Sequence, residues 1–369
     1  MAAVGTFGIA GAAAFGIIRA AEPATVVGQA SPAQSASQPA EFIPGYGRFG
    51  SGGFSDGTGS TGSASSASTS GTTATDAQQV GIVEINTVLQ YQNAAAAGTG
   101  MVLTSDGEIL TNNHVVQGAT SISVTISSTG ATYTATVVGT DPTDDVAVLQ
   151  LSDTSGLQTA HLSNDEATLG EAVTGVGNAG GTGTLTAADG TVTALDQDIT
   201  ASDESGSGAE QLTGLIETDA AIQAGDSGGP LYGSDGAIIG MDTAASSGGT
   251  AQGYAIPIGT ATAIADQIES GIDNATIHQG YPAFLGVSLQ DGANGAAVAG
   301  VLTDGPAADA GITAGVVITS VGGTPVGSAS DVASALAGYE AGDQVSIGWT
   351  TATGTPATAP VTLATGPAD

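Results

Sequence analysis

Short apolar runs separated by turn residues dominate the chain from about residue 79 onward. They include "GTGMVLTS", "SISVTI", "VAVLQL" and "GAIIGMDTA", and they are broken by Gly, Asp and Asn. Runs rich in Val, Ile and Thr that recur roughly every 8–12 residues are typical of the strands of a β-sandwich or β-barrel. The chain is therefore constrained to a mainly β fold. One stretch at 260–270, "TATAIADQIES", has apolar residues at helical spacing and predicts a helix after the strands.

A second, smaller unit is expected from about Tyr281 to the end. The stretches "AFLGVSL", "AAVAGVL", "GVVITSVGG" and "DQVSIGWT" have the pattern of strands. Between them, "SASDVASALAGY" predicts a helix with Ser328 or Ser330 near its start and Gly338 after its end. Strands with one or two helices predict a compact α+β module.

The N-terminal part of the chain has a different composition. Residues 1–18 are uncharged and mostly apolar, and Arg19 follows them. At about 1.5 Å per residue this stretch is near the lower limit for a bilayer span, and a signal-peptide core is an alternative. We expect a hydrophobic anchor or export signal at 1–20. Residues 21–78 are rich in Gly, Ser, Thr and Ala, and we expect a disordered linker because they have little apolar surface to bury.

The charge balance excludes several classes of partner. The chain has 35 acidic residues and 2 basic ones, Arg19 and Arg48, which gives a net charge of −33. Phosphate contacts need cationic side chains, so nucleic acid binding is excluded, as is docking of a basic patch on an anionic membrane. Three explanations of the missing basic residues stay open. They are a saline or acidic medium, resistance to proteases that cut after Lys or Arg, and simple drift of composition. Cysteine is absent, so disulfides and thiolate metal sites are excluded.

A glycine-rich stretch, "AGDSGGPL" at 224–231, surrounds Ser227. Nucleophilic serine catalysis needs a hydroxyl held beside a base, together with free backbone N–H groups aimed at the developing oxyanion. Gly225 permits the strained turn that this requires, because it has no Cβ to clash. Gly228 and Gly229 leave room for a substrate strand. Most serines in such loops are ordinary turn residues, so the interpretation depends on partners elsewhere in the chain.

His114 and Asp145 are the candidate partners. His114 follows an apolar run in "LTNNHVV", and Asp145 precedes the apolar run of "DDVAVLQL". A base whose other ring nitrogen is held by a buried carboxylate suits the chemistry, and the order His, Asp, Ser is one of the known arrangements. Asp144 is the competing carboxylate, and we prefer Asp145 because it adjoins the buried run. The remaining histidines have no second ligand at metal spacing, so no metal site is expected.

These motifs together resemble the HtrA/Deg family of trypsin-fold serine proteases. The resemblance rests on "GTGMVLTSDGEILTNNHVV", "TDDVAVLQL", "TDAAIQAGDSGGPL" and "GYAIPI", and on "FLGVSL", "GPAADAGITAG" and "VVITSVGGTPVGSASDVASAL", which are similar to the family's PDZ domain. It implies a double six-stranded β-barrel protease domain at 79–275 and a PDZ domain at 281–369. It also implies hydrolysis of peptide bonds in unfolded or misfolded proteins, no cofactor, a location in the bacterial envelope, and homo-oligomers such as trimers.

The resemblance also implies roles for single residues. Ser227 is matched to the nucleophile, His114 to the general base and Asp145 to the acid that orients it. The loop Gly225, Asp226 and Ser227 is matched to the oxyanion hole. The family often has Asn where this chain has Asp226, and its "IGNP" segment reads "VGNAGG" here.

Two binding sites are expected from the same resemblance. Ala221 lies six residues before the nucleophile, where the trypsin fold lines its primary specificity pocket, and Ile222 lies beside it. No carboxylate stands at that position, so small or medium apolar side chains are expected there. In the PDZ domain, the loop Phe284, Leu285, Gly286 and Val287 is expected to capture a peptide C-terminus by strand addition.

Two other functions stay open. The same scaffold could serve as a catalytically weak chaperone that holds unfolded chains, and it could serve as a processing protease with one dedicated target. Cleavage of casein by the wild type and not by Ser227→Ala separates the enzyme from the holding protein.

Overall fold

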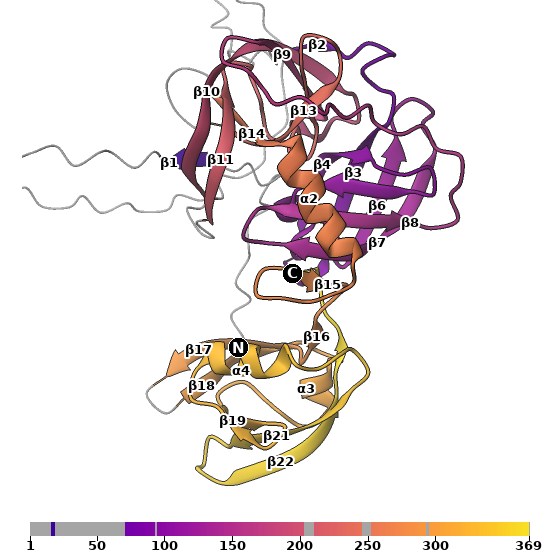
Figure 1. Ribbon diagram of the computed structural model, residues 1–369. Helices are drawn as coiled ribbons and strands as arrows, with labels where there is room; N and C mark the ends of the chain where they lie inside the picture. The colour runs from indigo at the N-terminus through magenta and orange to yellow at the C-terminus, as the bar shows by residue number, and fades with distance from the viewer. Residues whose placement is uncertain are drawn as a thin grey trace, which may run out of the picture. The chain divides into compact units, whose positions relative to one another are not determined.

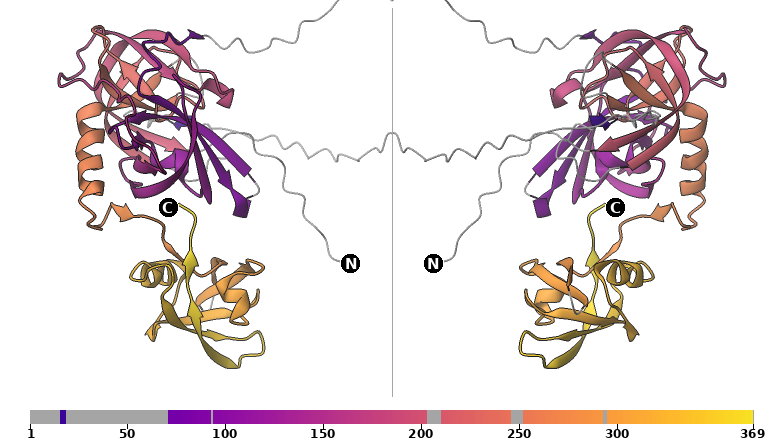
Figure 2. Two further views of the ribbon diagram at one scale, coloured as in Figure 1. Left: turned by 90° about the vertical axis from the view of Figure 1, so that its right-hand side faces the viewer. Right: turned by 90° about the vertical axis from the view of Figure 1, so that its left-hand side faces the viewer.

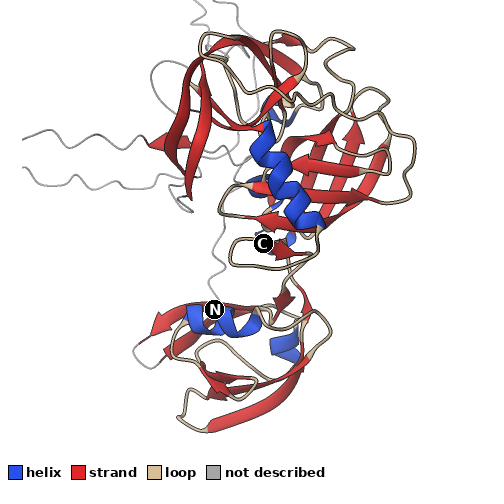
Figure 3. Cartoon of the chain, viewed as in Figure 1, coloured by secondary structure: helices blue, strands red, loops and turns tan. Residues whose placement is uncertain are grey.

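The computed structural model describes residues 16–18, 71–92, 94–202, 210–245, 252–292 and 295–368. Strands form two closed six-stranded barrels and a smaller α+β module, and helices are few (Figures 1 and 3). This confirms the predicted double-barrel fold with a PDZ-type module. Within the described ranges, every helix is too short or too polar to cross a bilayer. The expected anchor at 1–20 and the linker up to residue 70 lie outside the described residues, apart from β1 (Gly16–Ile18).

The first barrel is closed by pairing of β7 with β8. Its strands are β3 (Ile82–Leu89), β4 (Ala94–Val102), β5 (Glu108–Thr111), β6 (Ser121–Ile126), β7 (Thr132–Asp141) and β8 (Val146–Leu151). Along β8, Val148 and Leu149 are both fully buried, but they belong to different apolar clusters. Successive side chains of a strand point to opposite faces, so one faces the barrel interior and the other faces the second barrel and α2. This explains why the strand has a continuous apolar sequence and not an alternating one.

The second barrel is closed by pairing of β9 with β10. Its strands are β9 (Ala172–Gly177), β10 (Thr186–Ser202), β11 (Glu210–Thr218), β12 (Pro230–Tyr232), β13 (Ile238–Ala245) and β14 (Gly253–Pro257). The long β10 pairs with β9 through its first third and with β11 through the rest, and β1 adds to its far end. A single bent strand therefore connects the two edges of the sheet.

The predicted helix after the strands is α2 (Ile258–Glu269), whose buried face contains Ile258, Ala261, Ile264, Ala265 and Ile268. It packs against strands of both barrels, β7, β8, β13 and β14, on their outer side (Figures 1 and 2). Three short elements accompany the barrels, namely η1 (Gln90–Gln92), α1 (Asn113–Val116) and η2 (Ala179–Gly181). The chain then passes through β15 (His278–Gln279), which pairs with β7.

The main sheet of the α+β module has five strands in a row, and a sixth, short strand pairs with one of them. It comprises β16 (Ala283–Phe284), β17 (Val287–Gly292), β18 (Gly295–Val301), α3 (Pro306–Asp309), β19 (Val317–Val321), β20 (Thr324–Pro325), α4 (Ala329–Leu336), β21 (Gln344–Thr350), β22 (Pro356–Thr362) and β23 (Ala364–Thr365). Helix α4 begins after Ser328, whose hydroxyl accepts a hydrogen bond from the N–H of Asp331. One of the two expected caps is thereby confirmed.

The linker that we expected at 21–78 extends too far at its C-terminal end. Residues 71–78 lie against the second barrel, because β2 (Thr72–Thr73) pairs with β10 and Ala74 is buried. The hydroxyl of Tyr232 donates to the carbonyl of Gln78 at 2.9 Å. The Thr and Ala of this stretch are small enough to fill a barrel edge, and β10 supplies the hydrogen-bond partners that composition alone does not reveal.

Candidate active site

The first barrel presents His114 on the single turn α1, directly after β5. Val115 and Val116 of the same turn are buried in the barrel core, and they anchor the turn. The side chain of His114 is 5% exposed. Its orientation is therefore set by packing of the neighbouring valines and by the polar contacts that its ring makes.

Asp145 precedes β8 and lies under the imidazole. Its carboxylate is 2.9 Å from Nδ1 of His114 through Oδ2 and accepts the backbone N–H of His114 at 3.0 Å through Oδ1. The hydroxyl of Thr243 donates to Oδ2, and Nδ2 of Asn112 donates to the Asp145 carbonyl. Asp145 has φ of 55°, in the left-handed region, which is uncommon outside glycine and is tolerated best by Asp and Asn. The ring is thus held by Asp145 and not by the competing Asp144.

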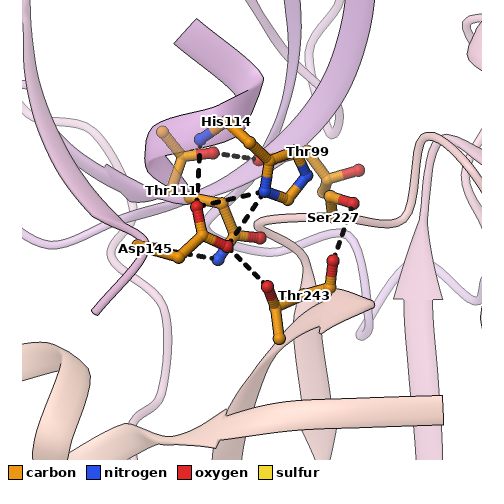
Figure 4. A network of polar contacts seen from close by, with 7 residues as sticks. Thr99, Thr111, His114, Asp145, Ser227 and Thr243 are labelled. Carbon is orange, nitrogen blue, oxygen red and sulfur yellow. Dashed lines mark hydrogen bonds and ion pairs between the residues drawn. The ribbon is translucent and has the colours of Figure 1, made fainter. Parts of the chain in front are cut away.

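Ser227 lies in the loop between β11 and β12 of the second barrel. Its hydroxyl is 3.3 Å from the carbonyl oxygen of Thr243. Figure 4 shows the imidazole of His114 between the carboxylate of Asp145 and the hydroxyl of Ser227. The structure therefore brings together three predicted residues that come from both barrels.

Gly225 has the strained conformation that the sequence predicts, but Gly228 and Gly229 do not make room for a substrate strand, because both are buried and a Cβ on them would meet the carbonyl oxygens of Thr99 and Val176. Gly225 has φ of 97°, and a Cβ there would lie 2.2 Å from the carbonyl oxygen of Asn178. The N–H groups of Gly225 and Ser227 donate to no acceptor within the described part of the chain. The side chain of Asp226, by contrast, is buried against Gly177 of β9.

Thr99 of β4 fastens this loop to the first barrel. Its hydroxyl donates to the carbonyl of Gly225 at 2.8 Å and accepts the N–H of Asn178 at 2.9 Å. Its own N–H donates to the carbonyl of Ser227 at 2.9 Å. Thr99 is fully buried, so these hydrogen bonds are shielded from water and hold the loop in one position.

Replacing Thr99 by valine should therefore destabilise the barrels. The substitution leaves a buried carbonyl and a buried N–H without a partner, which costs about 1–3 kcal/mol. Denaturant unfolding of Thr99→Val should show this loss of free energy of unfolding. The control is Thr125→Val on the outside of the first barrel, where a change of no more than about 0.5 kcal/mol is expected. An equal loss in the two variants would contradict this role of Thr99.

The two expected binding sites are placed as follows. Ile222 is buried and its side chain fills the space beside Gly253 and Gly175, while Ala221 is half-exposed. In the smaller module, Leu285 is buried and Gly286 has φ of 78°. The N–H groups of Leu285 and Gly286 donate to no acceptor among the described residues. Across the described residues, His, Asp and Glu form no group of three that could hold a metal ion.

Comparisons with known proteins match both parts of the chain. Residues 98–241 match the trypsin-like peptidase domain and residues 283–350 match the PDZ domain. The periplasmic serine endoprotease DegP of Escherichia coli is 34% identical over 274 residues, which cover 70% of this chain and 55% of DegP. The chain belongs to the HtrA/Deg family.

Other proteins match this HtrA/Deg chain over a similar share of its length. The periplasmic pH-dependent serine endoprotease DegQ of Escherichia coli is 36% identical, over 68% of this chain and 56% of DegQ. A solved structure of the serine endoprotease from Yersinia pestis is 25% identical, over 79% of this chain and 98% of that chain, with a TM-score of 0.45. The chain spans about half the length of the curated relatives it matches.

Two residues of this HtrA/Deg site were missed by sequence reasoning. Thr243 supports Asp145 from 98 positions away, and Thr99 supports Gly225 from 126 positions away. Both threonines lie inside apolar strand runs, where Thr is a common strand residue. Nothing local in the sequence separates them from the other threonines, because their role depends on how the two barrels face each other.

Proposed function

We propose that the chain is a cofactor-free serine endopeptidase that cleaves unfolded or misfolded proteins. The observation that carries the proposal is the contact of 2.9 Å between Nδ1 of His114 and the buried carboxylate of Asp145, with Ser227 beside the same ring. A base oriented in this way can take the proton of a neighbouring hydroxyl. The names of the curated relatives, which are serine endoproteases, support the same reaction class.

The proposed reaction passes through an acyl-enzyme. Oγ of Ser227 attacks the substrate carbonyl, and its proton moves to Nε2 of His114. The imidazolium that forms is stabilised by Asp145, and the oxyanion accepts the N–H groups of Gly225 and Ser227. His114 then gives the proton to the leaving amine, which departs. Water, deprotonated by the same imidazole, hydrolyses the ester and restores the Ser227 hydroxyl.

The proposed primary specificity is for small or medium apolar side chains. Ile222 is buried and fills the space beside two glycines, and Ala221 adds only a methyl group. Neither residue offers a charge to a Lys or Arg side chain. The substrate side chain would therefore be selected by apolar contact and by size.

The proposed role of the PDZ domain is to bind peptide C-termini. Strand β17 is bonded to β18 alone among the described strands, which leaves one edge open for an added strand. The free N–H groups of Leu285 and Gly286 lie just before that edge, where a terminal carboxylate would accept them. Phe284 and Val287 flank this loop.

Binding of such peptides should be weak. No Lys or Arg occurs in this domain, so affinity rests on backbone donors and an apolar pocket. Titration of a fluorescent peptide with an apolar C-terminal residue should saturate below millimolar concentration, and the same peptide with an amidated C-terminus should bind at least about tenfold more weakly. Equal binding of the two peptides would contradict capture of the carboxylate.

We further propose that the protease acts outside the cytoplasm, in the cell envelope or the exterior. The relatives are named periplasmic, and this supports the location. The anchor or export signal at 1–20, the assembly into trimers and the domain limits at 79–275 and 281–369 stay predictions.

Casein cleavage tests the proposed activity. The wild type should degrade casein, and Ser227→Ala should not. Suppression of aggregation by both forms would show a holding activity in addition. Failure of the wild type to cleave casein or any unfolded protein, with the fold intact, would contradict the proposal.

A further inference from the structure

Two buried carboxyl groups lie behind the nucleophile loop, and the proposed reaction uses neither of them. Asp226 is 4% exposed and Asp242 is fully buried. Asp226 directly precedes Ser227, and Asp242 directly precedes Thr243, which donates to Asp145. Each acid is therefore one residue away from the Ser227, His114 and Asp145 network.

Backbone hydrogen bonds connect the two acids to the same loop. The N–H of Gly228 donates to the carbonyl of Asp242, and the N–H of Asp242 donates to the carbonyl of Gly229, both at 2.8 Å. Movement of Asp242 is thus transmitted to the residues that follow Ser227. Asp226 itself belongs to the loop whose N–H groups point to the proposed oxyanion site.

The facing strand β9 makes room for both acids with two glycines. A Cβ on Gly177 would lie 2.6 Å from Oδ1 of Asp226, and a Cβ on Gly175 would lie 3.0 Å from Oδ2 of Asp242. Oδ2 of Asp226 accepts the N–H of Gln223 at 2.9 Å. Oδ1 of Asp226 and both carboxyl oxygens of Asp242 have no hydrogen-bond partner among the described residues.

Within the described ranges, no Lys or Arg side chain is present that could compensate these acids. The two arginines of the chain lie outside the described residues. Burial raises the pKa of Asp226 to about 7. Burial, and secondarily the charge of Asp226, raise the pKa of Asp242 well above its usual range.

The elements around the pair add few titratable groups. Strand β9 faces it with glycines, and β14 places Ala255 opposite Asp242. The titratable groups on the packed elements are Tyr254 on β14, Tyr232 on β12, Asp219 before the loop, Glu217 on β11, and His114 and Asp145 across Thr243.

We propose that Asp226 and Asp242 are a positioning pair, which holds the nucleophile loop in its active arrangement only while the two carboxyls keep at least one proton between them. The inference rests on the proposed function. A buried carboxyl that keeps its proton carries no charge and so avoids the cost of an ionised group without a partner. Two negative charges buried in one uncompensated region of low dielectric repel each other.

Loss of the last proton should therefore disassemble the site. Burial raises the pKa of both carboxyls, that of Asp226 to about 7, so the pair carries two charges only above about that pH. Once both carboxyls are ionised, the repulsion between them pushes the loop that contains Gly225 and Ser227 away from the strand that contains Thr243. The alignment of the hydroxyl with its base and with the N–H groups is then lost, although neither carboxyl touches the substrate.

The rate of Ser227 labelling by a fluorophosphonate, measured on the full chain from pH 5 to pH 10, tests the pair. For the wild type we expect the labelling rate to fall on the alkaline side, by about tenfold per pH unit once the pair loses its last proton. Asp242→Asn and Asp226→Asn should each abolish this fall, because neither variant can hold two charges. The control is Glu217→Gln, another buried carboxyl in the same barrel, which should keep the wild-type profile.

The outcomes separate the inference from the function on which it rests. A fall that persists in both Asn variants, or variants that are slower by the same factor at every pH, would overturn the pairing and leave a structural role. The pairing would also be overturned if the wild type lost its far-UV circular dichroism over the same pH range in which its labelling rate falls. Global unfolding would then explain the profile. Absence of labelling in all variants at every pH would instead overturn the proposed function.

Discussion

Replacing Asp145 by asparagine should lower kcat/KM for a peptide substrate by about 10⁴-fold. The carboxylate accepts from the backbone N–H and the ring of His114 and from the Thr243 hydroxyl. An amide would turn an NH₂ group towards one of these donors, so the imidazole would change its tautomer or its orientation. Steady-state kinetics with a fluorogenic peptide measure the effect.

The matched control for this substitution is the adjacent acid. Asp144 is half-buried and its N–H donates to Asp141, but it makes no bond to His114 among the described contacts. Asp144→Asn should keep kcat/KM within about threefold of the wild type. A large loss in Asp144→Asn with a small loss in Asp145→Asn would show that the wrong carboxylate has been assigned.

Replacing Gly225 by alanine should slow acylation by at least about 10²-fold, the range found when one oxyanion donor is lost. The new Cβ would lie 2.2 Å from the carbonyl oxygen of Asn178, so the backbone has to move. Movement displaces the N–H groups of Gly225 and Ser227 that face the proposed oxyanion site. The rate of a single acylation by an active ester reports this loss separately from binding.

A second glycine of similar conformation is the control for backbone strain. Gly236, in the turn between β12 and β13, has φ of 82°, and a Cβ there would meet nothing within 4 Å. Gly236→Ala should cost about 1–2 kcal/mol of stability, as a left-handed residue does, and should leave acylation unchanged. Equal acylation rates in Gly225→Ala and the wild type would contradict the proposed oxyanion loop.

The sequence predicted those parts of the molecule that depend on local pattern or on a motif. The apolar runs predicted the strands, and "TATAIADQIES" predicted α2 because its apolar residues recur at helical spacing. The candidate active-site residues also came from local features, namely the glycine-rich loop, one histidine after a strand and one acid before a strand. The structure brings these residues together. Asp145 was preferred to Asp144 from its place beside a buried run, and the geometry around His114 agrees with that preference.

The parts that could not be predicted depend on how distant strands meet. Thr99, Thr243 and Asp242 lie in strand runs that have no distinguishing neighbours. Their positions beside the nucleophile loop follow from barrel closure and from two glycines on β9 that leave space for buried carboxyls. The linker was extended too far for a related reason, because residues 71–78 resemble the preceding Ser/Thr/Ala-rich sequence and are distinguished only by their pairing with β10.

Covalent labelling of the native protein tests the central claim most directly. A fluorophosphonate reacts only with a serine whose hydroxyl has a base beside it and whose neighbouring N–H groups stabilise the charged adduct. We expect one adduct per chain, mapped to Ser227 by mass spectrometry, that is absent from Ser227→Ala and strongly reduced in His114→Ala. An adduct at another residue, or unchanged labelling of the His114→Ala variant, would contradict the account.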